Sequence, residues 1–543
     1  MFSKNKLSII GLFAVLLALV AYYFGLFVDL TGDAGKYAAI ARHIVESGDF
    51  IHLKIHGAPY EQKPPLIFWL AAVGFKLGGF TNFGYKLFLL LYGFLGVFFT
   101  YKLGKSLYNK FTGQLAASFL FFSEFCFLYS MDIHTDLLLQ TNVALALWQL
   151  WEYLKYHKIK NFIWAFIGIG LAMMSKGPIG GAVPAFALGT YLILQKKWRE
   201  LFHPKWIAGI LIALIVASPA FIGLIDQFGL QGIKFFFWTN NIGRISGSYV
   251  GNNTDYLFYI HTMLYMYTPW ALLLFAALVM EFKVLRKKDK PAATWFVHGA
   301  IWIYFVIISC ARGKAPNYIF ILVPLFSVLT ARWTAFTLDH PAQKGLKTLQ
   351  VLQNITLALG WLFTLTVMIY LFPSSNRGYW LILVLTIAAT IYVFTQKKQA
   401  TAKLILPSIL MMSLLQFYMN SYAFPYMFSY QASSQAARIY NAKAGKNAKI
   451  YNYLYGQYEL FFYAKDDAIE ISNSQQLKQA LEKSGSWIFT TQAGMDTINL
   501  IHPPNIEVTY RLKHRGMNRI GGKFIFPPTR QQSLQKMYLI KTQ

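Results

Sequence analysis

LSIIGLFAVLLALVAYYFGLFV, residues 7–28, is a run of 22 residues without a charged side chain. A helix rises about 1.5 Å per residue, so this run can cross the hydrocarbon core of a bilayer, which is about 30 Å thick. It resembles the core of a signal peptide but lacks a small-residue cleavage site, and we expect it to remain as the first membrane span. Similar runs recur along most of the 543 residues, of which 56% are hydrophobic. The sequence therefore predicts a multi-pass membrane protein.

The apolar runs predict thirteen transmembrane helices, so the expected fold class is a polytopic α-helical membrane protein. The expected spans lie near residues 7–28, 83–101, 113–130, 137–154, 161–174, 178–195, 206–225, 257–281, 293–310, 317–336, 349–372, 379–396 and 404–421. Two long segments fall outside them, residues 29–82 and 422–543. We therefore expect a transmembrane domain, residues 1–421, and a C-terminal domain, residues 422–543.

The net charge of +28 is distributed unevenly between the segments that join the spans. Basic clusters fall in every second segment, around residues 4–6, 102–110, 155–160, 196–205, 283–290, 344–347 and 397–403. Cytoplasmic loops of membrane proteins carry such an excess of Lys and Arg. The pattern predicts a cytoplasmic amino terminus, with residues 29–82 and the C-terminal domain on the far side. It also accounts for the charge without nucleic acid as a partner.

The first external segment, residues 29–82, is longer than a simple connection needs. Ala34–Ser47 has apolar residues at helical spacing and is followed by Gly48, and Leu66–Leu77 is strongly apolar. We expect two helices at the membrane surface. The stretch between them, residues 56–65, contains three prolines and therefore predicts a fixed loop rather than a helix.

The segment from residue 422 to residue 543 is more polar than the rest of the chain. It has strand-like pieces at Ile450–Tyr455, Glu459–Tyr463 and Trp487–Thr490, and a helical pattern at Ser474–Lys483. These features predict a small extracytoplasmic α/β domain. Its excess of basic residues suits contact with anionic lipid headgroups or an anionic acceptor. An ordinary solvated surface accounts for the same excess.

Some basic residues break the charge pattern because they fall on the expected outer side, where acidic residues accompany them. The basic residues are Lys36, Lys63, Lys176, Arg244, Arg312 and Lys314, and the acidic residues are Asp29, Asp33, Glu61, Asp132 and Asp136. A carboxylate beside several cations suits sugar transfer from a lipid phosphate, because the cations stabilise the leaving phosphate and the carboxylate can act as a general base. The donor bond is already activated, so this chemistry requires no nucleotide site.

Simpler structural roles exist for the same residues. Asp33 precedes an amphipathic run, where aspartate is a favoured helix cap. Lys63 can extend its ammonium group to the lipid headgroups. Lys176 and Arg244 fall at the ends of spans, where basic residues commonly anchor a helix at the interface.

Five motifs in chain order resemble a known family. The stretch from Asp33 to Phe50, followed by Pro59-Tyr-Glu-Gln-Lys-Pro-Pro65, resembles the first external loop of bacterial aminoarabinose transferases and the related protein mannosyltransferases, which are C-type membrane glycosyltransferases. The further matches are Thr135-Asp136, Met174-Ser-Lys176-Gly-Pro178, Asn241-Ile-Gly-Arg244 before Thr268-Pro-Trp270, and Ala311-Arg-Gly-Lys314-Ala-Pro-Asn-Tyr318. The resemblance covers roughly residues 7–340.

The resemblance implies a role for each matched residue. Asp33 matches the essential acid of the first loop and is the candidate catalytic residue, and Tyr37 follows it one helical turn later. Lys63, Lys176 and Arg244 match basic residues that bind the donor phosphate.

The cavity residues and the metal question also follow from the resemblance. Asp136 and Tyr318 match polar residues that line the cavity, and Glu61 joins this group as a candidate acceptor contact. The family often has an acid immediately before the lysine of the Lys-Pro pair, where this chain has Gln62. We expect no required cofactor, and the sequence leaves the participation of a divalent cation undecided.

The implied reaction is a single inverting displacement at the periplasmic face of a bacterial inner membrane. The donor is a polyprenyl phosphate sugar, such as an undecaprenyl phosphate sugar, and the acceptor is a lipid, a glycan or a protein. Asp33 either accepts a proton from an acceptor hydroxyl or orients the substrates if the acceptor is already ionised. A transporter or flippase of a lipid-linked sugar is the alternative, although such proteins commonly show internal repeats, and none is evident here.

Overall fold

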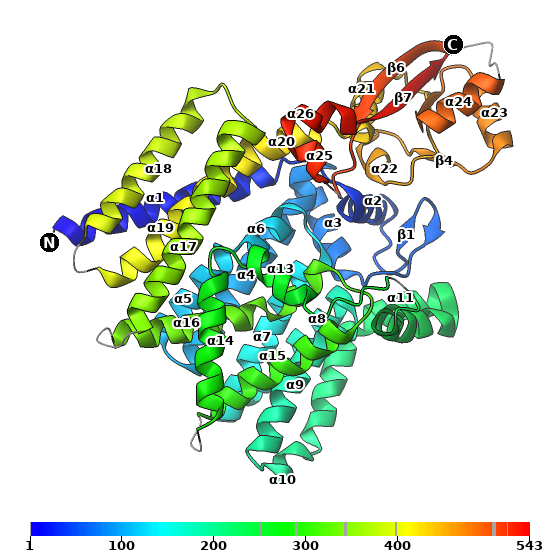
Figure 1. The fold of residues 1–543 in the computed structure, drawn as a ribbon. Helices are drawn as coiled ribbons and strands as arrows, with labels where there is room; N and C mark the ends of the chain where they lie inside the picture. The colour runs from blue at the N-terminus through cyan, green and yellow to red at the C-terminus, as the bar shows by residue number, and fades with distance from the viewer. Residues whose placement is uncertain are drawn as a thin grey trace.

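The computed structural model describes residues 2–249, 251–287, 291–340, 345–396, 399–501, 506–518 and 520–543. A large helical bundle carries a smaller unit with a β-sheet at one end (Figure 1). Among the described residues, eight helical segments are long and apolar enough to cross a bilayer. The chain is therefore a multi-pass membrane protein, and the count of thirteen spans stays a prediction.

The bundle is built from helices, many of which pack against helices distant in the sequence. Its α-helices are α1 (Phe2–Gly25), α4 (Asn82–Leu107), α5 (Lys110–Phe121), α6 (Glu124–Met131), α7 (Thr135–Tyr156), α8 (Ile159–Lys176), α9 (Ile179–Leu194), α10 (Trp198–Leu201), α11 (Lys205–Lys234), α12 (Gly243–Ser246), α13 (Phe258–Met266), α14 (Ala271–Leu285), α15 (Ala292–Cys310), α16 (Val323–Asp339), α17 (Gly345–Thr366), α18 (Arg377–Thr395), α19 (Ala400–Tyr418) and α20 (Phe424–Phe428). Extensive contacts join α7 to α8 and α4, α15 to α9, α16 to α5, and α1 to α19.

Two helices occupy the first external segment, as its sequence predicts. They are α2 (Gly32–Ser47) and α3 (Leu66–Gly78), and the short strands β1 (Lys54–Ile55) and β2 (Ala58–Pro59) form an antiparallel hairpin between them. Helix α2 ends at Gly48, whose left-handed backbone, with φ of 74°, lets its N–H bond the carbonyl of Ile44. The apolar face of α2 packs against α3, so the hairpin loop is held beside the bundle.

Several expected spans are interrupted or extended. The run expected at 113–130 forms two helices, α5 and α6, because Ser123 caps the second one by accepting a hydrogen bond from the backbone of Cys126. The run expected at 257–281 is likewise divided into α13 and α14. Helix α11 continues to Lys234 with a kink at Gly229, and a π-helix, η1 (Phe235–Ile242), then leads into α12. Much of the expected outer segment 226–256 is therefore helical.

The segment after α19 remains helical beyond residue 421. It continues through the π-helix η4 (Met419–Ala423) and α20, so the expected domain boundary falls within a helical run. The remaining short helices of the bundle are η2 (Pro316–Leu322) and η3 (Val367–Leu371).

A five-stranded sheet forms the core of the C-terminal unit. Its elements are α21 (Ala432–Lys443), β3 (Ile450–Tyr453), α22 (Glu459–Tyr463), β4 (Ile469–Ile471), α23 (Ser474–Glu482), β5 (Trp487–Thr491), α24 (Gln492–Ile501), β6 (Ile506–His514), α25 (Gly522–Ile525), α26 (Pro527–Arg530), η5 (Gln531–Ser533) and β7 (Gln535–Thr542). The strand order is β4-β3-β5-β7-β6, in which β3 runs parallel to β4 and β5, whereas β7 is antiparallel to β5 and β6.

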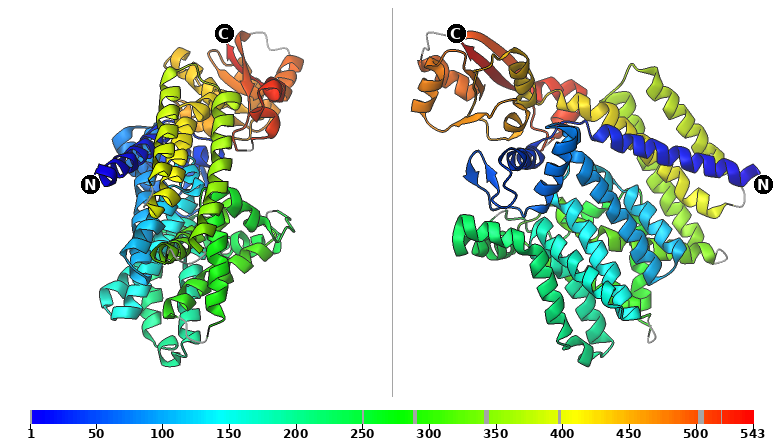
Figure 2. Two further views of the ribbon diagram at one scale, coloured as in Figure 1. Left: turned by 60° about the vertical axis from the view of Figure 1, so that its left-hand side comes forward. Right: turned by 180° about the vertical axis from the view of Figure 1, so that it is seen from behind.

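One strand expected in this unit is a helix instead. Glu459–Tyr463 forms α22, and the consecutive residues Leu460, Phe461 and Phe462 are all buried. Three consecutive buried residues fit a helical turn that packs between two surfaces. In a strand with one solvated face, buried and exposed residues would alternate. The surface that α22 contacts is α2, which lies directly beneath the C-terminal unit (Figure 2).

Candidate functional site

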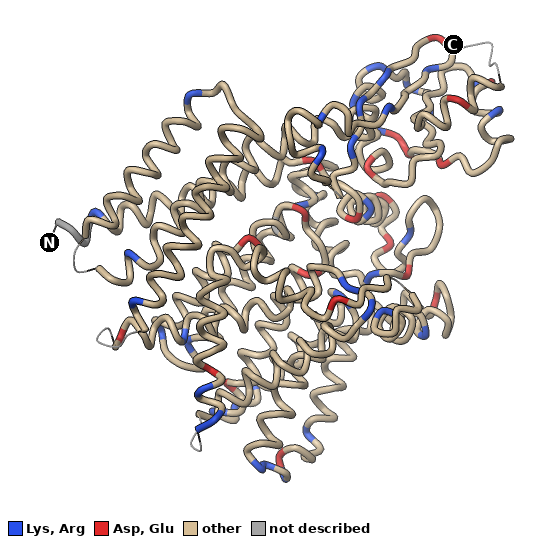
Figure 3. The backbone as a smooth tube through the Cα atoms, viewed as in Figure 1, with Lys and Arg blue, Asp and Glu red and all other residues tan. Residues whose placement is uncertain are grey.

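The predicted site residues come from the ends of elements that converge beside α2. Asp33 lies in the first turn of α2 and Asp136 in the first turn of α7, whereas Lys176 is the last residue of α8. Lys63 precedes the prolines that lead into α3, Arg244 lies on α12 and Tyr318 on η2. Basic and acidic segments lie close together in this region of the backbone (Figure 3).

Asp136 is the centre of the most tightly bonded part of the site. Its side chain is buried, and Lys176 donates to one carboxylate oxygen over 2.5 Å. The amide of Asn317 donates to the other oxygen over 2.7 Å. The ammonium group of Lys176 also lies 4.7 Å from the ring centre of Tyr318. Asp136 therefore neutralises and fixes one of the three predicted phosphate-binding cations.

Arg244 reaches the same cluster from η1 and α12. Its guanidinium group donates to the hydroxyl of Tyr318 over 2.5 Å and to the amide oxygen of Asn240 over 3.0 Å. Asn240 in turn donates to the backbone carbonyl of Gln62, next to Lys63, over 3.3 Å. Arg244 is thus held by neutral acceptors, which orient it without cancelling its charge.

Lys63 lies close to the other two cations and lacks a bonded counter-charge. No hydrogen bond or ion pair joins its ammonium group to any of the described residues. Burial, together with the positive charges of Lys176 and Arg244, lowers the pKa of Lys63 to about 7, and Asp136 and Asp33 offset only part of this effect. An anion bound beside Lys63 would stabilise the protonated form of its amine and so restore its positive charge.

Asp33 faces this cluster from α2 with nearly half of its side chain, 48%, exposed. Burial tends to raise the pKa of Asp33, but the ammonium group of Lys36 at 2.9 Å, with His134 and Lys63, holds the pKa below its usual value. Thr31, not Asp33, occupies the capping position of α2. The capping role considered for Asp33 is therefore wrong, and its carboxylate is ionised and accessible.

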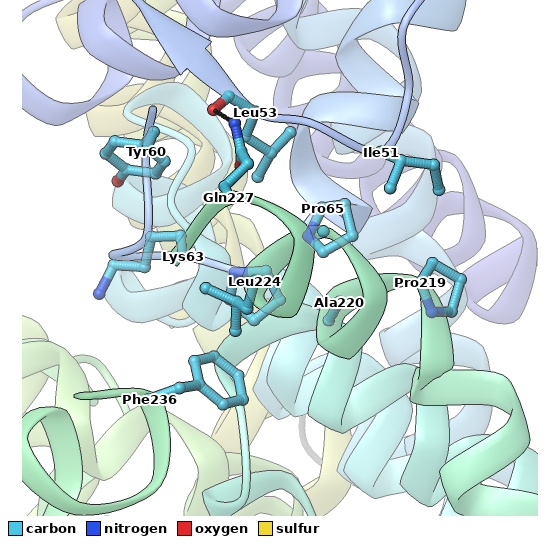
Figure 4. A pocket seen from close by; sticks show the side chains of 12 residues that line it. Ile51, Leu53, Tyr60, Lys63, Pro65, Pro219, Ala220, Leu224, Gln227 and Phe236 are labelled. Atoms are coloured by element: carbon cyan, nitrogen blue, oxygen red, sulfur yellow. Dashed lines mark hydrogen bonds between the residues drawn. The ribbon is translucent and has the colours of Figure 1, made fainter. Parts of the chain in front are cut away.

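A narrow cavity lies between the Lys63 loop and α11. Tyr60, Lys63 and Pro65 line it on one side, and Ala220 and Leu224 on the other (Figure 4). Its volume of about 10 Å³ is close to the space that one water molecule needs. The cavity lies between the backbone of the Lys63 loop and the apolar surface of α11.

Known proteins resemble this chain in sequence and in fold. Residues 62–222 match the family described as dolichyl-phosphate-mannose-protein mannosyltransferase. An undecaprenyl phosphate-α-4-amino-4-deoxy-L-arabinose arabinosyl transferase of Proteus mirabilis is 26% identical over 394 residues, covering 69% of this chain and 68% of that protein. An uncharacterized protein of Aquifex aeolicus is 25% identical over 458 residues, covering 83% and 86%. The chain is thus similar to an aminoarabinose transferase over about two thirds of its length.

The solved structures extend the likeness to the whole fold. The crystal structure of the transferase ArnT from Cupriavidus metallidurans, bound to undecaprenyl phosphate, matches with a TM-score of 0.74 at 17% identity and covers 97% of both chains. The chain therefore has the same fold as ArnT over nearly its whole length.

Two of the predicted site residues lie apart from the charged cluster. Tyr37 is buried beneath it, where its ring packs edge-on against Phe68 and His134 and makes no described hydrogen bond. Burial raises the pKa of the Tyr37 hydroxyl well above its ordinary value. Glu61 lies at the rim, and burial alone raises the pKa of its carboxyl, so no described charge is near enough to act on it. Tyr37 supports the site, whereas Glu61 does not join it.

The structure also adds residues that the sequence interpretation left out. Asn317 bonds Asp136, and Asn240 bonds Arg244. Each is adjacent to a motif residue, Tyr318 or Asn241, so its place beside the motif was the sequence feature that could have identified it. His134 bonds Asp132 over 3.1 Å and lies near Asp33, and these carboxylates outweigh the effect of burial and raise its pKa. The hydroxyl of Tyr60 is buried without a described partner.

Metal-binding side chains show no clustering in the part of the chain that the structure describes. No three or more His, Cys, Asp or Glu side chains lie close enough together there to hold one ion. Positive groups at the site include the side chains of Lys63, Lys176 and Arg244, and that of Lys36 beside Asp33.

Proposed function

We propose that this chain transfers a sugar from a polyprenyl phosphate donor, such as an undecaprenyl phosphate sugar, to a lipid, glycan or protein acceptor. The observation that carries the proposal is the convergence of Lys63, Lys176 and Arg244, in which Lys63 has no described counter-charge. The name of the Proteus mirabilis relative supports the donor class. The distribution of basic loops supports a bacterial inner membrane location, with the site on the periplasmic side.

The three cations suit a phosphate that carries more charge when it leaves than when it arrives. Hydrogen bonds to charged groups are worth roughly 1.5–3 kcal/mol each, and donors held in place before the reaction need no reorganisation during it. Arg244 is oriented by Tyr318 and Asn240, and Lys176 by Asp136. Lys63 becomes the third cation when the bound phosphate raises its pKa and the amine takes up a proton from water.

The bond changes follow from this arrangement. An acceptor oxygen attacks the anomeric carbon of the sugar, the bond from that carbon to the phosphate oxygen breaks, and the configuration at the carbon inverts. Asp33 takes the proton of an acceptor hydroxyl, or orients the substrates where the acceptor is already an anion. Its lowered pKa makes it a weak base, so the proton moves late, when the attacking oxygen has become acidic.

Replacing Asp33 tests this function. We expect Asp33→Asn to reduce transfer of a labelled sugar from undecaprenyl phosphate by at least about 1,000-fold, because the amide keeps the shape of the side chain but neither carries charge nor accepts a proton. The variant should still bind undecaprenyl phosphate, which the cations hold. The assay uses purified protein in detergent, where a transporter without transferase activity gives no product.

Asp226→Asn is the matched control. Asp226 lies on α11 on the same side of the molecule, is half exposed and contacts only His52 among the described residues. This variant should keep full activity. Unchanged turnover of Asp33→Asn would contradict the assigned role, and absence of any transfer by the unmodified protein with every acceptor class would favour the transporter alternative.

A further inference from the structure

A second pocket lies at the opposite ends of the two helices that carry Asp136 and Lys176. Its volume is about 340 Å³, and it is formed by the last turns of α7 and the first turns of α8. Asp136 and Lys176 lie at the other ends of these helices. A helix of the length of α7 spans about 33 Å at 1.5 Å per residue, which is close to the thickness of a bilayer core. The pocket therefore lies at the opposite membrane surface from the candidate active site.

Two buried amide side chains face this pocket. Gln149 is 8% exposed and Asn161 is 7% exposed, and both line the pocket. Neither side chain has a hydrogen-bond partner among the described residues. Their polar atoms are open to the pocket, where a ligand or ordered water can bond them. Together they provide four hydrogens for donation and two oxygens for acceptance.

The charged residues of the pocket leave a positive excess. Lys158 and Lys160 line it, and Glu152 is its one acidic lining residue. The carboxylate of Glu152 is already engaged by the hydroxyl of Ser106, which donates to it. The ammonium group of Lys158 lies 5.8 Å from the ring centre of Tyr156, and neither lysine has a described carboxylate partner. The pocket thus combines two ammonium groups with neutral donors, and this combination complements a phosphate group.

The aromatic residues around the pocket place it at the level of lipid headgroups. Trp148 and Trp164 line it, and 51% of Trp164 is exposed. Tryptophan is enriched where the hydrocarbon core meets the polar region of a membrane. A ligand that enters here therefore comes from the lipid of this surface, and its acyl chains can lie along the exposed apolar residues of α8, Ile159 and Ile163.

We propose that this pocket binds the headgroup of an anionic glycerophospholipid. Lys158 and Lys160 hold its phosphate, the amides of Gln149 and Asn161 donate to its phosphate and ester oxygens, and the remaining oxygen of Glu152 accepts from a headgroup hydroxyl. Phosphatidylglycerol has all of these groups. The site is separate from the candidate active site, so it does not depend on the proposed transferase function.

Native mass spectrometry of the full chain in detergent, titrated with phosphatidylglycerol, tests the proposal. We expect the double variant Lys158→Gln/Lys160→Gln, and separately Gln149→Leu/Asn161→Leu, to weaken binding of one lipid molecule by at least about 10-fold. The control Lys105→Gln/Lys110→Gln removes the same charge from the same surface at two exposed positions outside the pocket lining, and it should bind as the unmodified protein does. The amide variant separates a defined site from general attraction to positive charge.

Two further probes identify the ligand chemistry. Phosphatidylcholine has the same phosphate but no net charge and no headgroup hydroxyl, so it should bind at least about 10-fold more weakly. Inorganic phosphate should not displace the lipid, because the proposal includes the acyl chains. Equal binding of both lipids, displacement by inorganic phosphate, or equal loss in the control variant would each overturn the proposal.

Discussion

At the scale of single residues, the clearest chemical signal is the low pKa of Lys63. Burial and the charges of Lys176 and Arg244 lower it to about 7, so near neutral pH the empty site holds Lys63 partly deprotonated. Only the protonated form attracts the donor phosphate. A bound phosphate dianion raises the pKa of Lys63, and binding is therefore linked to uptake of a proton.

This linkage predicts how affinity depends on pH. Between pH 7 and pH 9 the affinity for undecaprenyl phosphate should fall by up to about tenfold per pH unit, because each unit removes protonated Lys63 from the empty protein. Lys63→Arg should remove this slope, since a guanidinium group stays charged throughout the range. The measurement is binding of undecaprenyl phosphate at a series of pH values.

A matched substitution shows whether the slope belongs to Lys63. Lys314 lies on the same side of the molecule, where its ammonium group donates to the carbonyl of Asn253. Lys314→Arg should keep the slope of the unmodified protein. A slope that survives Lys63→Arg would assign the titration to another group.

The residues of the site differ in how far the sequence could reveal them. Lys63, Lys176 and Arg244 were predictable because each is a basic residue on the side where the positive-inside pattern makes such residues rare, and Asp33 because it accompanies them in a recognisable motif. Glu459 gave no such signal, since it falls in a polar segment where an acid is ordinary. Its importance depends on contacts with Thr31 and Gly32, which are more than 400 residues away.

At the scale of elements, α2 is a helix without a cap of its own. Thr31 takes the capping position, but its side chain makes no capping hydrogen bond. Glu459 of α22 supplies the acceptor instead, because one of its oxygens accepts from the backbone of Gly32 over 2.8 Å and from the hydroxyl of Thr31 over 3.3 Å. A negative charge at this end also complements the helix dipole. Glu459 thereby fixes the turn that carries Asp33.

We expect Glu459→Ala to lower kcat by at least about 10-fold, because the first turn of α2 loses its acceptor and Asp33 loses its fixed position. The affinity for undecaprenyl phosphate should change by less than about twofold, since the cations that bind it lie on other elements. Glu459→Gln should recover part of kcat, because its amide oxygen can still accept from Gly32. Steady-state kinetics and binding measurements separate the two quantities.

Glu470→Ala controls for general damage to the C-terminal unit. Glu470 accepts from Asn452 over 2.6 Å within the sheet and makes no described contact with α2. The variant Glu470→Ala should leave kcat nearly unchanged. A fall in kcat equal to that of Glu459→Ala would show that stability of the unit, rather than the position of Asp33, governs the rate.

The helix interruptions show what an apolar pattern cannot predict. The run expected at 113–130 is mostly apolar, but the chain turns at Phe122 and Ser123, and Ser123 then caps α6. Hydropathy is insensitive to this turn, because the residues before and after it are buried in the same protein interior. Helix α11 likewise continues past residue 225 to Lys234, because the polar residues there extend the helix instead of forming a loop.

At the scale of the whole molecule, the candidate active site is closed from two directions. The bundle contributes Lys176, Asp136 and Arg244, and the C-terminal unit covers α2 from above (Figure 2). Arg438 of α21 bonds both oxygens of Asp29, over 2.6 and 2.7 Å, just before α2 begins. The sequence predicted an outer domain but not its docking, because the paired residues are more than 400 positions apart and each is unremarkable in its own segment.

Arg530 joins the end of the chain to the bundle, and its replacement tests whether the two parts are one stable unit. It is 6% exposed, and its guanidinium group donates to the carbonyls of Leu371, Phe524 and Ile525 over 2.8–2.9 Å. Its charge lies 4.7 Å from the ring centre of Phe372. Arg530→Met keeps an apolar stem but leaves these carbonyls without a donor, and we expect a loss of about 3 kcal/mol in the free energy of unfolding.

The same substitution should loosen the tail before the bundle unfolds. Phe524 is fully buried, so chymotrypsin should cleave after it slowly in the unmodified protein and at least about 10-fold faster in Arg530→Met. Arg511→Met, at an exposed position on β6, should change neither the cleavage rate nor the thermal midpoint. Faster cleavage without a lower midpoint would mean that the tail docks independently of the bundle. A fall in both would mean that the cover over Asp33 and the membrane-spanning helices unfold together.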